Sequence, residues 1–196
     1  MSNMQLDTLR RIVQEINASV SLHDSLDIMV NHVAEAMHVD VCSIYLLDER
    51  NKRYVLMASK GLKPEAVGHV SLNVGEGLVG LVGKREEIVN LDNAQKHERF
   101  AYLPETGEEL FNSFLGVPVM YRRKVMGVLV VQNQEPQDFS EAAESFLVTL
   151  CAQLSGVIAH AHAVGNIDVF RKPTSGPSYK TFQGVSGAGC IPSGRP

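Results

Sequence analysis

The chain has 196 residues, of which 44% are hydrophobic and 20% charged, the proportions of an ordinary globular domain with one full core. Four of its 18 basic residues follow Asp168, and all 22 acidic residues lie at or before it, so residues 1–170 carry 14 basic and 22 acidic side chains, a net charge of −8. This acidic body argues against a nucleic-acid partner, and the sequence shows neither a signal peptide nor an apolar run approaching the ~18 residues that span a bilayer. We therefore expect a cytoplasmic domain with no membrane segment.

Two amphipathic helices are predicted at the start of the chain. Apolar residues recur at three- and four-residue spacing over residues 4–20, which places them in one stripe along a helix. Ser21 and Asp24 resemble a capping box. They predict the start of a second helix that runs to Met37.

From Val41 onward the pattern predicts short strands. Residues 41–47 and 54–58 are rich in strand-forming residues and flank the polar turn 48–52, which indicates a hairpin. Further along the chain we expect a short helix at 64–67, a strand at 69–74, a glycine-rich turn leading into a short helix at 75–83, and a strand at 88–91.

Residues 92–113 show mixed charges and no clean period, and loops of this length inside a domain are usually functional or disordered. We interpret this segment as a lid. Residues 114–121 and 125–132 predict a second hairpin, and Pro118 suggests an edge position or a bulge in its first strand. Ser140 is expected to cap a long final helix.

Long helices at both ends of a mostly antiparallel sheet are typical of the α+β class. We expect both terminal helices to pack on one face of the sheet. The other face would then be left for a pocket covered by the lid.

The chain resembles the GAF domain family over about residues 2–165. The resemblance is carried by 42–48, Gly61-Leu62, 72–80, 116–119, 125–129 and 139–141. It implies an α+β GAF fold in which the second sheet face forms the floor of a ligand pocket.

A second resemblance lies in the tail. Residues 182–194 are similar to the first strand and turn of the enzyme I module of the phosphoenolpyruvate phosphotransferase system, after a Pro/Gly/Ser-rich linker. The predicted organisation is a GAF-like domain at 1–168, a linker at 169–181 and the start of a truncated phosphotransferase module at 182–196. A GAF domain joined to such a module is similar to nitrogen-type enzyme I.

That resemblance implies a regulatory function without catalysis in this chain. The GAF domain would sense glutamine or 2-oxoglutarate and control phosphorylation, by phosphoenolpyruvate, of a histidine beyond residue 196. No cofactor is expected in this chain, and magnesium would belong to the missing module. The expected partners are the metabolite, the downstream module and, through the helices at 4–20 and 140–163, a second copy.

The candidate ligand-binding residues come from three segments of the predicted pocket. Ser43 and Tyr45 lie on the strand face opposite the apolar one, where they could line a pocket or a tolerated surface. Leu78 and Val79 open the short helix, whose N-terminus could hold a carboxylate. The lid and its exit supply Phe100, Tyr102, Phe111, Asn112 and Ser113, which could either enclose a ligand or plug the pocket.

Several other site types are less well supported. Gly75-x-Gly77-x-x-Gly80 matches a dinucleotide fingerprint, but the strands do not alternate with crossover helices, so close packing explains the glycines better. The Lys–Asp pair of cyclic-nucleotide GAF domains is missing. No cysteine lies between Cys42 and Cys151, as free methionine sulfoxide reductases would require, and the histidines show no metal spacing. An unliganded dimerisation module remains the alternative.

Overall fold

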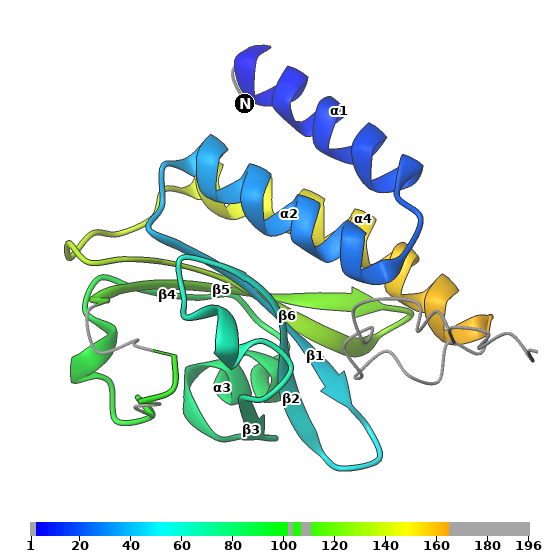
Figure 1. Ribbon diagram of the computed structural model, residues 1–196. Coiled ribbons are helices and arrows are strands. Elements are labelled where there is room, and N and C mark those ends of the chain that lie inside the picture. The colour runs from blue at the N-terminus through cyan, green and yellow to red at the C-terminus, as the bar shows by residue number, and fades with distance from the viewer. Residues whose placement is uncertain (1–2, 102–103, 107–110, 165–196) are drawn as a thin grey trace, which may run out of the picture.

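A six-stranded antiparallel sheet lies between two layers of helices (Figure 1). The computed structural model describes residues 3–101, 104–106 and 111–164. The strand order is β3-β2-β1-β6-β5-β4. The strands are β1 Val41–Asp48, β2 Arg53–Lys60, β3 Ser71–Asn73, β4 Val89–Leu91, β5 Ser113–Tyr121 and β6 Lys124–Asn133.

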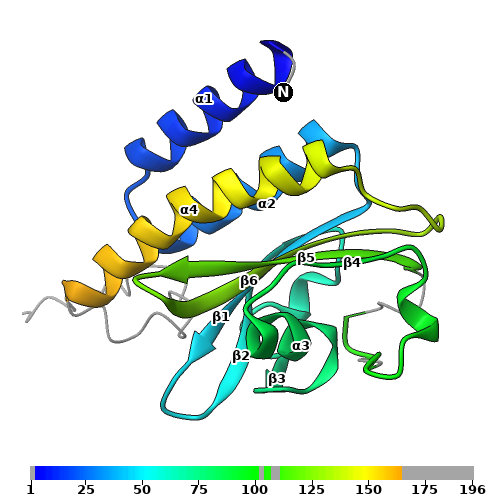
Figure 2. The same cartoon turned by 180° about the vertical axis from the view of Figure 1, so that it is seen from behind.

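Three long helices form the layer on one side of the sheet. They are α1 Asn3–Ala18, α2 Leu22–Met37 and α4 Glu141–Ala163. Figures 1 and 2 show α2 and α4 lying against the sheet, with α1 packed outside them. The predicted caps are present, since Ser21 Oγ accepts from the Asp24 N–H at 3.1 Å and Ser140 Oγ from the Ala143 N–H at 3.3 Å.

Smaller elements cover the other face. They are α3 Gly77–Arg85 and the 3₁₀ turns η1 Pro64–Ala66 and η2 Ala94–Lys96. Side chains alternate along β1, so that Cys42 and Ile44 join the core beneath the long helices, whereas Val41 and Tyr45 join the core beneath α3. Both faces of the central strands are therefore buried, and the predicted α+β arrangement is confirmed.

Pro118 lies where β5 has an open edge. β4 pairs with β5 at residues 114–116, and the β5–β6 register shifts between Val119 and Met120. Proline lacks a backbone N–H, so an open edge or an irregular register is where a strand tolerates it. The prediction for this strand is confirmed.

Helix α4 is more apolar than the sequence pattern suggested. The 23-residue helix is long and apolar enough to cross a membrane by length and composition alone, because an 18-residue window within it has a mean hydropathy of 1.5. Length and composition alone do not make it a membrane span, so the expectation of no membrane segment stays a prediction. Its apolar residues include Phe146, Leu150, Leu154 and Ile158, which are buried in the core between α4 and the sheet.

Glycines allow α3 to lie close to the sheet. A Cβ atom added at Gly83 would lie 1.9 Å from the Tyr54 hydroxyl oxygen, and one at Gly80 would lie 2.7 Å from the Gly75 carbonyl carbon. Gly75 and Gly77 have φ values of +87° and +63°, which favour glycine. Close packing and backbone conformation thus account for the glycines of the fingerprint-like motif.

We expect Gly83→Ala to lower the free energy of unfolding by about 2 kcal/mol, because the new methyl group displaces the buried Tyr54 ring. Urea denaturation measures this change. The matched control is Gly156→Ala in α4, where an added Cβ has no neighbour within 4 Å; helix propensity should raise its stability by about 1 kcal/mol. Equal effects of the two substitutions would contradict close packing at Gly83.

Candidate functional site

A small cavity lies beneath the N-terminal half of α3, on the sheet face opposite the long helices. Its volume is about 20 Å³, room for about one water molecule. The lining residues are Leu72, Gly77, Leu78, Val79, Phe100, Ala101, Phe114 and Gln132. The pocket expected on this face is therefore present but almost filled by the protein's own side chains.

Aromatic side chains are buried in the core around this cavity. Tyr45 and Tyr54 are each 1% exposed, and Phe111 and Phe114 belong to the same buried cluster. Burial raises the pKa of the Tyr54 hydroxyl, and the negative charge of Glu86 raises it further. Tyr54 is therefore a neutral phenol at physiological pH.

The structure brings several predicted site residues together. Leu78, Val79 and Phe100 line the cavity. Tyr45 packs in the cluster around the cavity, and Ser43 is fully buried, with its Oγ 2.8 Å from Ser59 Oγ on β2. The face that carries these hydroxyls is therefore covered by protein, although their contact with a ligand stays a prediction.

Other predicted residues hold the sheet together at the exit of the lid. Asn112 Nδ2 donates to the Gln134 carbonyl oxygen at 2.6 Å, and Ser113 Oγ accepts from the Asn133 N–H at 3.2 Å. These bonds join the start of β5 to the end of β6. Tyr102 lies outside the described residues, and a role for any of the three in ligand binding stays a prediction.

Two basic side chains attach the predicted lid to its surroundings. Arg99 Nη1 donates to the Gly75 carbonyl oxygen at 3.3 Å, just before α3, and Lys63 Nζ donates to the Pro104 carbonyl oxygen at 3.1 Å. Both bonds are exposed to solvent. Such exposed bonds contribute only modestly to stability.

Sequence reasoning missed Gln132, the most unusual polar residue in the cavity wall. It is 3% exposed, and its Oε1 atom has no hydrogen-bond partner. A buried acceptor without a partner costs about 1–3 kcal/mol. The signal was present in the sequence, because Gln132 continues the strand face of Val128 and Val130, which are both buried in the same core.

The first turn of α3 provides hydrogen-bond donors at the same cavity. The first helical bond runs from the Gly80 N–H to the Glu76 carbonyl oxygen at 3.0 Å, so the earlier N–H groups lie at the open helix end. The Glu76 side chain does not cap them, since it accepts from the backbone and side-chain nitrogens of Asn73. Gly77, Leu78 and Val79 thus offer a partial positive charge beside Gln132.

Thiol and metal chemistry have little support at this site. Burial raises the pKa of the Cys42 and Cys151 thiols, so neither forms the reactive thiolate readily. Both lie in the core beneath the long helices, on the far side of the sheet from the cavity. Within residues 3–101, 104–106 and 111–164, no group of three His, Cys, Asp or Glu side chains could hold a metal ion.

Comparisons with known proteins place this fold in one family. The model of the GAF domain family matches residues 21–158. A phosphoenolpyruvate-dependent phosphotransferase system protein of Salmonella typhimurium is 42% identical over 167 residues, covering 85% of this chain and 22% of that protein. The chain therefore spans about a fifth of the length of this relative.

Two solved structures are similar over most of the chain. The GAF domain of an Acinetobacter phosphoenolpyruvate-protein phosphotransferase is 84% identical, with a TM-score of 0.77, covering 85% of this chain and 99% of that one. The GAF domain of the Coxiella burnetii phosphoenolpyruvate-protein phosphotransferase is 43% identical, with a TM-score of 0.80, covering 84% and 99%. In both cases nearly the whole solved domain is matched.

Replacing the unpartnered amide should stabilise the domain. We expect Gln132→Met to raise the free energy of unfolding by about 1 kcal/mol, because it removes a buried acceptor while nearly keeping the volume. Gln134→Met, at an exposed position on the same chain segment, should change it by less than about 0.5 kcal/mol. A destabilised Gln132→Met protein in urea denaturation would show that the amide has a stabilising partner.

Proposed function

Because the chain belongs to the GAF domain family, we propose that it is the metabolite-sensing, regulatory domain of a nitrogen-type phosphoenolpyruvate-protein phosphotransferase. The observation that carries this proposal is the 84% identity to the GAF domain of the Acinetobacter phosphotransferase. The GAF domain itself is not a catalytic domain. In this proposal the histidine that phosphoenolpyruvate phosphorylates lies beyond residue 196, and any magnesium belongs to that module.

The proposed ligand site is the cavity beneath α3. Its volume of about 20 Å³ leaves no room for a metabolite, so binding requires Phe100 and Ala101, or α3 itself, to move outward. A ligand can shift such an equilibrium only by binding one state more tightly than the other. The domain would therefore alternate between a self-filled state and a ligand-filled state.

The polar groups of the cavity favour glutamine over 2-oxoglutarate. The N–H groups at the start of α3 suit a carboxylate, which both metabolites carry. The Gln132 carbonyl oxygen needs a hydrogen-bond donor. Glutamine supplies N–H donors from its ammonium and amide groups, whereas 2-oxoglutarate carries only acceptors at neutral pH.

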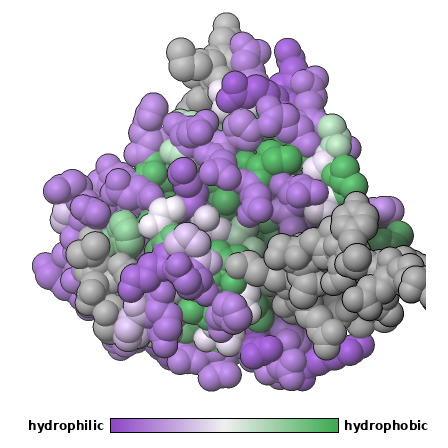
Figure 3. All heavy atoms as spheres, in the orientation of Figure 1, coloured by the Kyte–Doolittle hydropathy of each residue, from purple (hydrophilic) through white to green (hydrophobic). Residues whose placement is uncertain are grey.

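The proposed output runs through the long helices. Apolar side chains remain exposed on them or next to them, including Val20 at 97% and Val164 at 64%. Figure 3 shows apolar atoms at the surface beside α1, within a face that is otherwise mostly hydrophilic. We propose that α1 and α4 form a homodimer interface in the cytoplasm and that α4 passes the signal to the module that follows the predicted linker.

The rival function is an unliganded dimerisation module. The near-complete filling of the cavity favours this function. A domain that only holds two phosphotransferase chains together can do so with its pocket closed. A cyclic-nucleotide sensor has less support, because the positions that would carry the Lys–Asp pair are Gln134 and Ala143.

Thermal unfolding of the 196-residue chain separates these functions. Glutamine should raise the melting temperature with concentration, since a ligand at 100 times its Kd stabilises the folded state by about 2.7 kcal/mol. 2-Oxoglutarate should have a smaller effect and cyclic nucleotides none. Gln132→Met should abolish the glutamine effect in a protein that remains folded. If no metabolite shifts the transition, the sensing function is wrong and the unliganded module is favoured.

The dimer surface has its own test by sedimentation. We expect Val20→Asp to shift the chain toward monomer, because it places a charge within the proposed apolar interface. Val74→Asp makes the same change at another exposed valine, 47% exposed, on the α3 side of the sheet, and should leave the oligomeric state unchanged. A wild-type chain that is monomeric at micromolar concentration would contradict the proposed dimer.

A further inference from the structure

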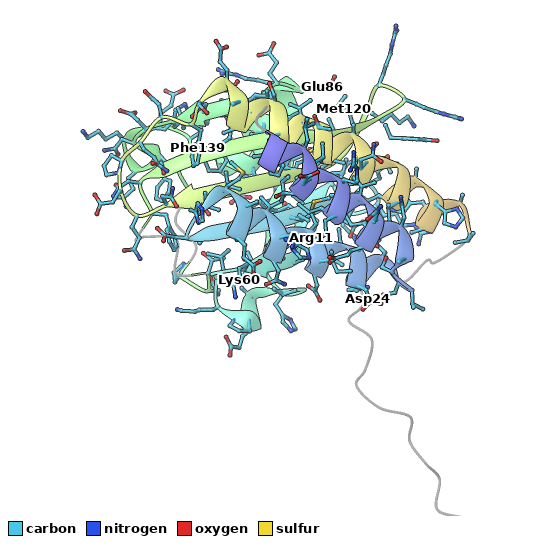
Figure 4. All side chains as sticks on the ribbon, turned by 90° about the horizontal axis from the view of Figure 1, so that it is seen from above. Arg11, Asp24, Lys60, Glu86, Met120 and Phe139 are labelled. Carbon is cyan, nitrogen blue, oxygen red and sulfur yellow. The ribbon has the colours of Figure 1, made fainter. Side chains whose placement is uncertain are left out.

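A groove separate from the cavity runs along one side of the molecule between α4 and the open edge of β5. We call it the α4–β5 groove; its volume is about 380 Å³. Figure 4 shows Glu86 and Met120 near each other beside α4. The groove is lined by Glu86, Glu87, Ile88, Val117, Pro118, Met120, Val148, Cys151 and Ala152.

The surface of this groove is apolar except at its acidic rim. Val148 and Ile88 are 43% and 38% exposed, and they are two of only six large hydrophobic residues that are exposed in the part of the chain that the structure describes. The exposed carboxylates of Glu86 and Glu87 lie at the α3–β4 connection. An occupant should therefore combine a large apolar side chain with neighbouring positive charge.

We propose that the segment 167–172 of this same chain docks in the α4–β5 groove. The segment lies outside the described residues, and its sequence is Ile-Asp-Val-Phe-Arg-Lys. Val169 and Phe170 match the apolar groove, and Arg171 and Lys172 match Glu86 and Glu87. The two basic residues directly follow the aromatic one, and the single acidic residue of the segment, Asp168, precedes both apolar residues named here.

The length of the chain permits this contact. Helix α4 ends with Val164 as its C-cap, and the next residue is Gly165, the residue type that most often reverses the chain after a helix. Ala152 lies twelve residues before Val164, about 18 Å along the helix axis at 1.5 Å per residue. The six residues from Val164 to Phe170 span up to about 20 Å when extended, so a fully extended segment brings Phe170 to the end of the groove at Ala152.

Docking at this place would connect the two sides of the domain. The groove is formed by the connection that leaves α3 and by the middle of α4. A shift of α3 over the cavity would therefore move Glu86 and Glu87 relative to Val148 and change the fit of the docked segment. The docking itself does not depend on which ligand the cavity binds, or on whether it binds one.

Hydrogen exchange of the 196-residue chain, read by mass spectrometry, tests the proposal. Amides of 166–172 should exchange about tenfold more slowly than their sequence alone dictates, while those of 174–181 exchange at the unprotected rate. Val148→Asp should remove the protection of 166–172, because it places a charge in the apolar groove. Val74→Asp, an equivalent change outside the groove, should leave it intact.

Reversing the charges on both sides of the proposed contact tests the acidic rim without disturbing the core. Glu86→Lys with Glu87→Lys should accelerate exchange of 166–172, and adding Arg171→Glu with Lys172→Glu should restore protection. Hydrogen exchange of the β1 and β6 amides in the same experiment shows whether each variant remains folded. If Val148→Asp unfolds the domain, the variants with reversed charges test the proposal instead. Unprotected 166–172 in the wild-type chain overturns the proposal. Protection that grows with protein concentration also overturns it, because a second copy would then supply the segment.

Discussion

The close packing of α3 on the sheet is the constraint on which the second face of this domain depends. Gly83 leaves room for the Tyr54 hydroxyl, and Gly80 lets the start of the helix pass the Gly75 backbone. Larger residues would lift the helix and open the space beneath it. The same closeness that buries the second face of the sheet reduces the cavity to about 20 Å³. Tight packing and ligand access therefore oppose each other at one helix.

Gln132 differs from the other buried polar residues of the sheet in its hydrogen bonding. Asn90 Nδ2 donates at 2.8 Å to both the Phe139 carbonyl oxygen and Glu144 Oε1, and joins β4 to the start of α4. Within the described chain, three buried side-chain atoms lack a partner, in His23, His32 and Gln132. Of these residues, only Gln132 lines the cavity. A group left unpaired beside open helix donors is more informative about binding than the many amides that are fully bonded.

Much of the fold could be predicted from the sequence because its strands and helices carry clean periods. The alternation along β1 placed Cys42 and Tyr45 on opposite faces, and the Ser21 cap marked the start of α2. The candidate site was harder, because a sequence pattern does not give volumes. It could not distinguish a pocket lined by aromatic residues from one filled by them. It suggested Asn112 from its place at the exit of the predicted lid, and it gave no sign that the Asn112 amide bonds to the Gln134 carbonyl oxygen.

The two outermost strands, β3 and β4, are each only three residues long. A sheet edge offers unpaired N–H and C=O groups to any passing extended chain, and a short edge offers few of them. Where β5 extends past β4, Pro118 lacks a backbone N–H to offer to another strand. The borders of the sheet thus resist strand-by-strand aggregation. Each border of the sheet therefore gives another extended chain few places to add a strand.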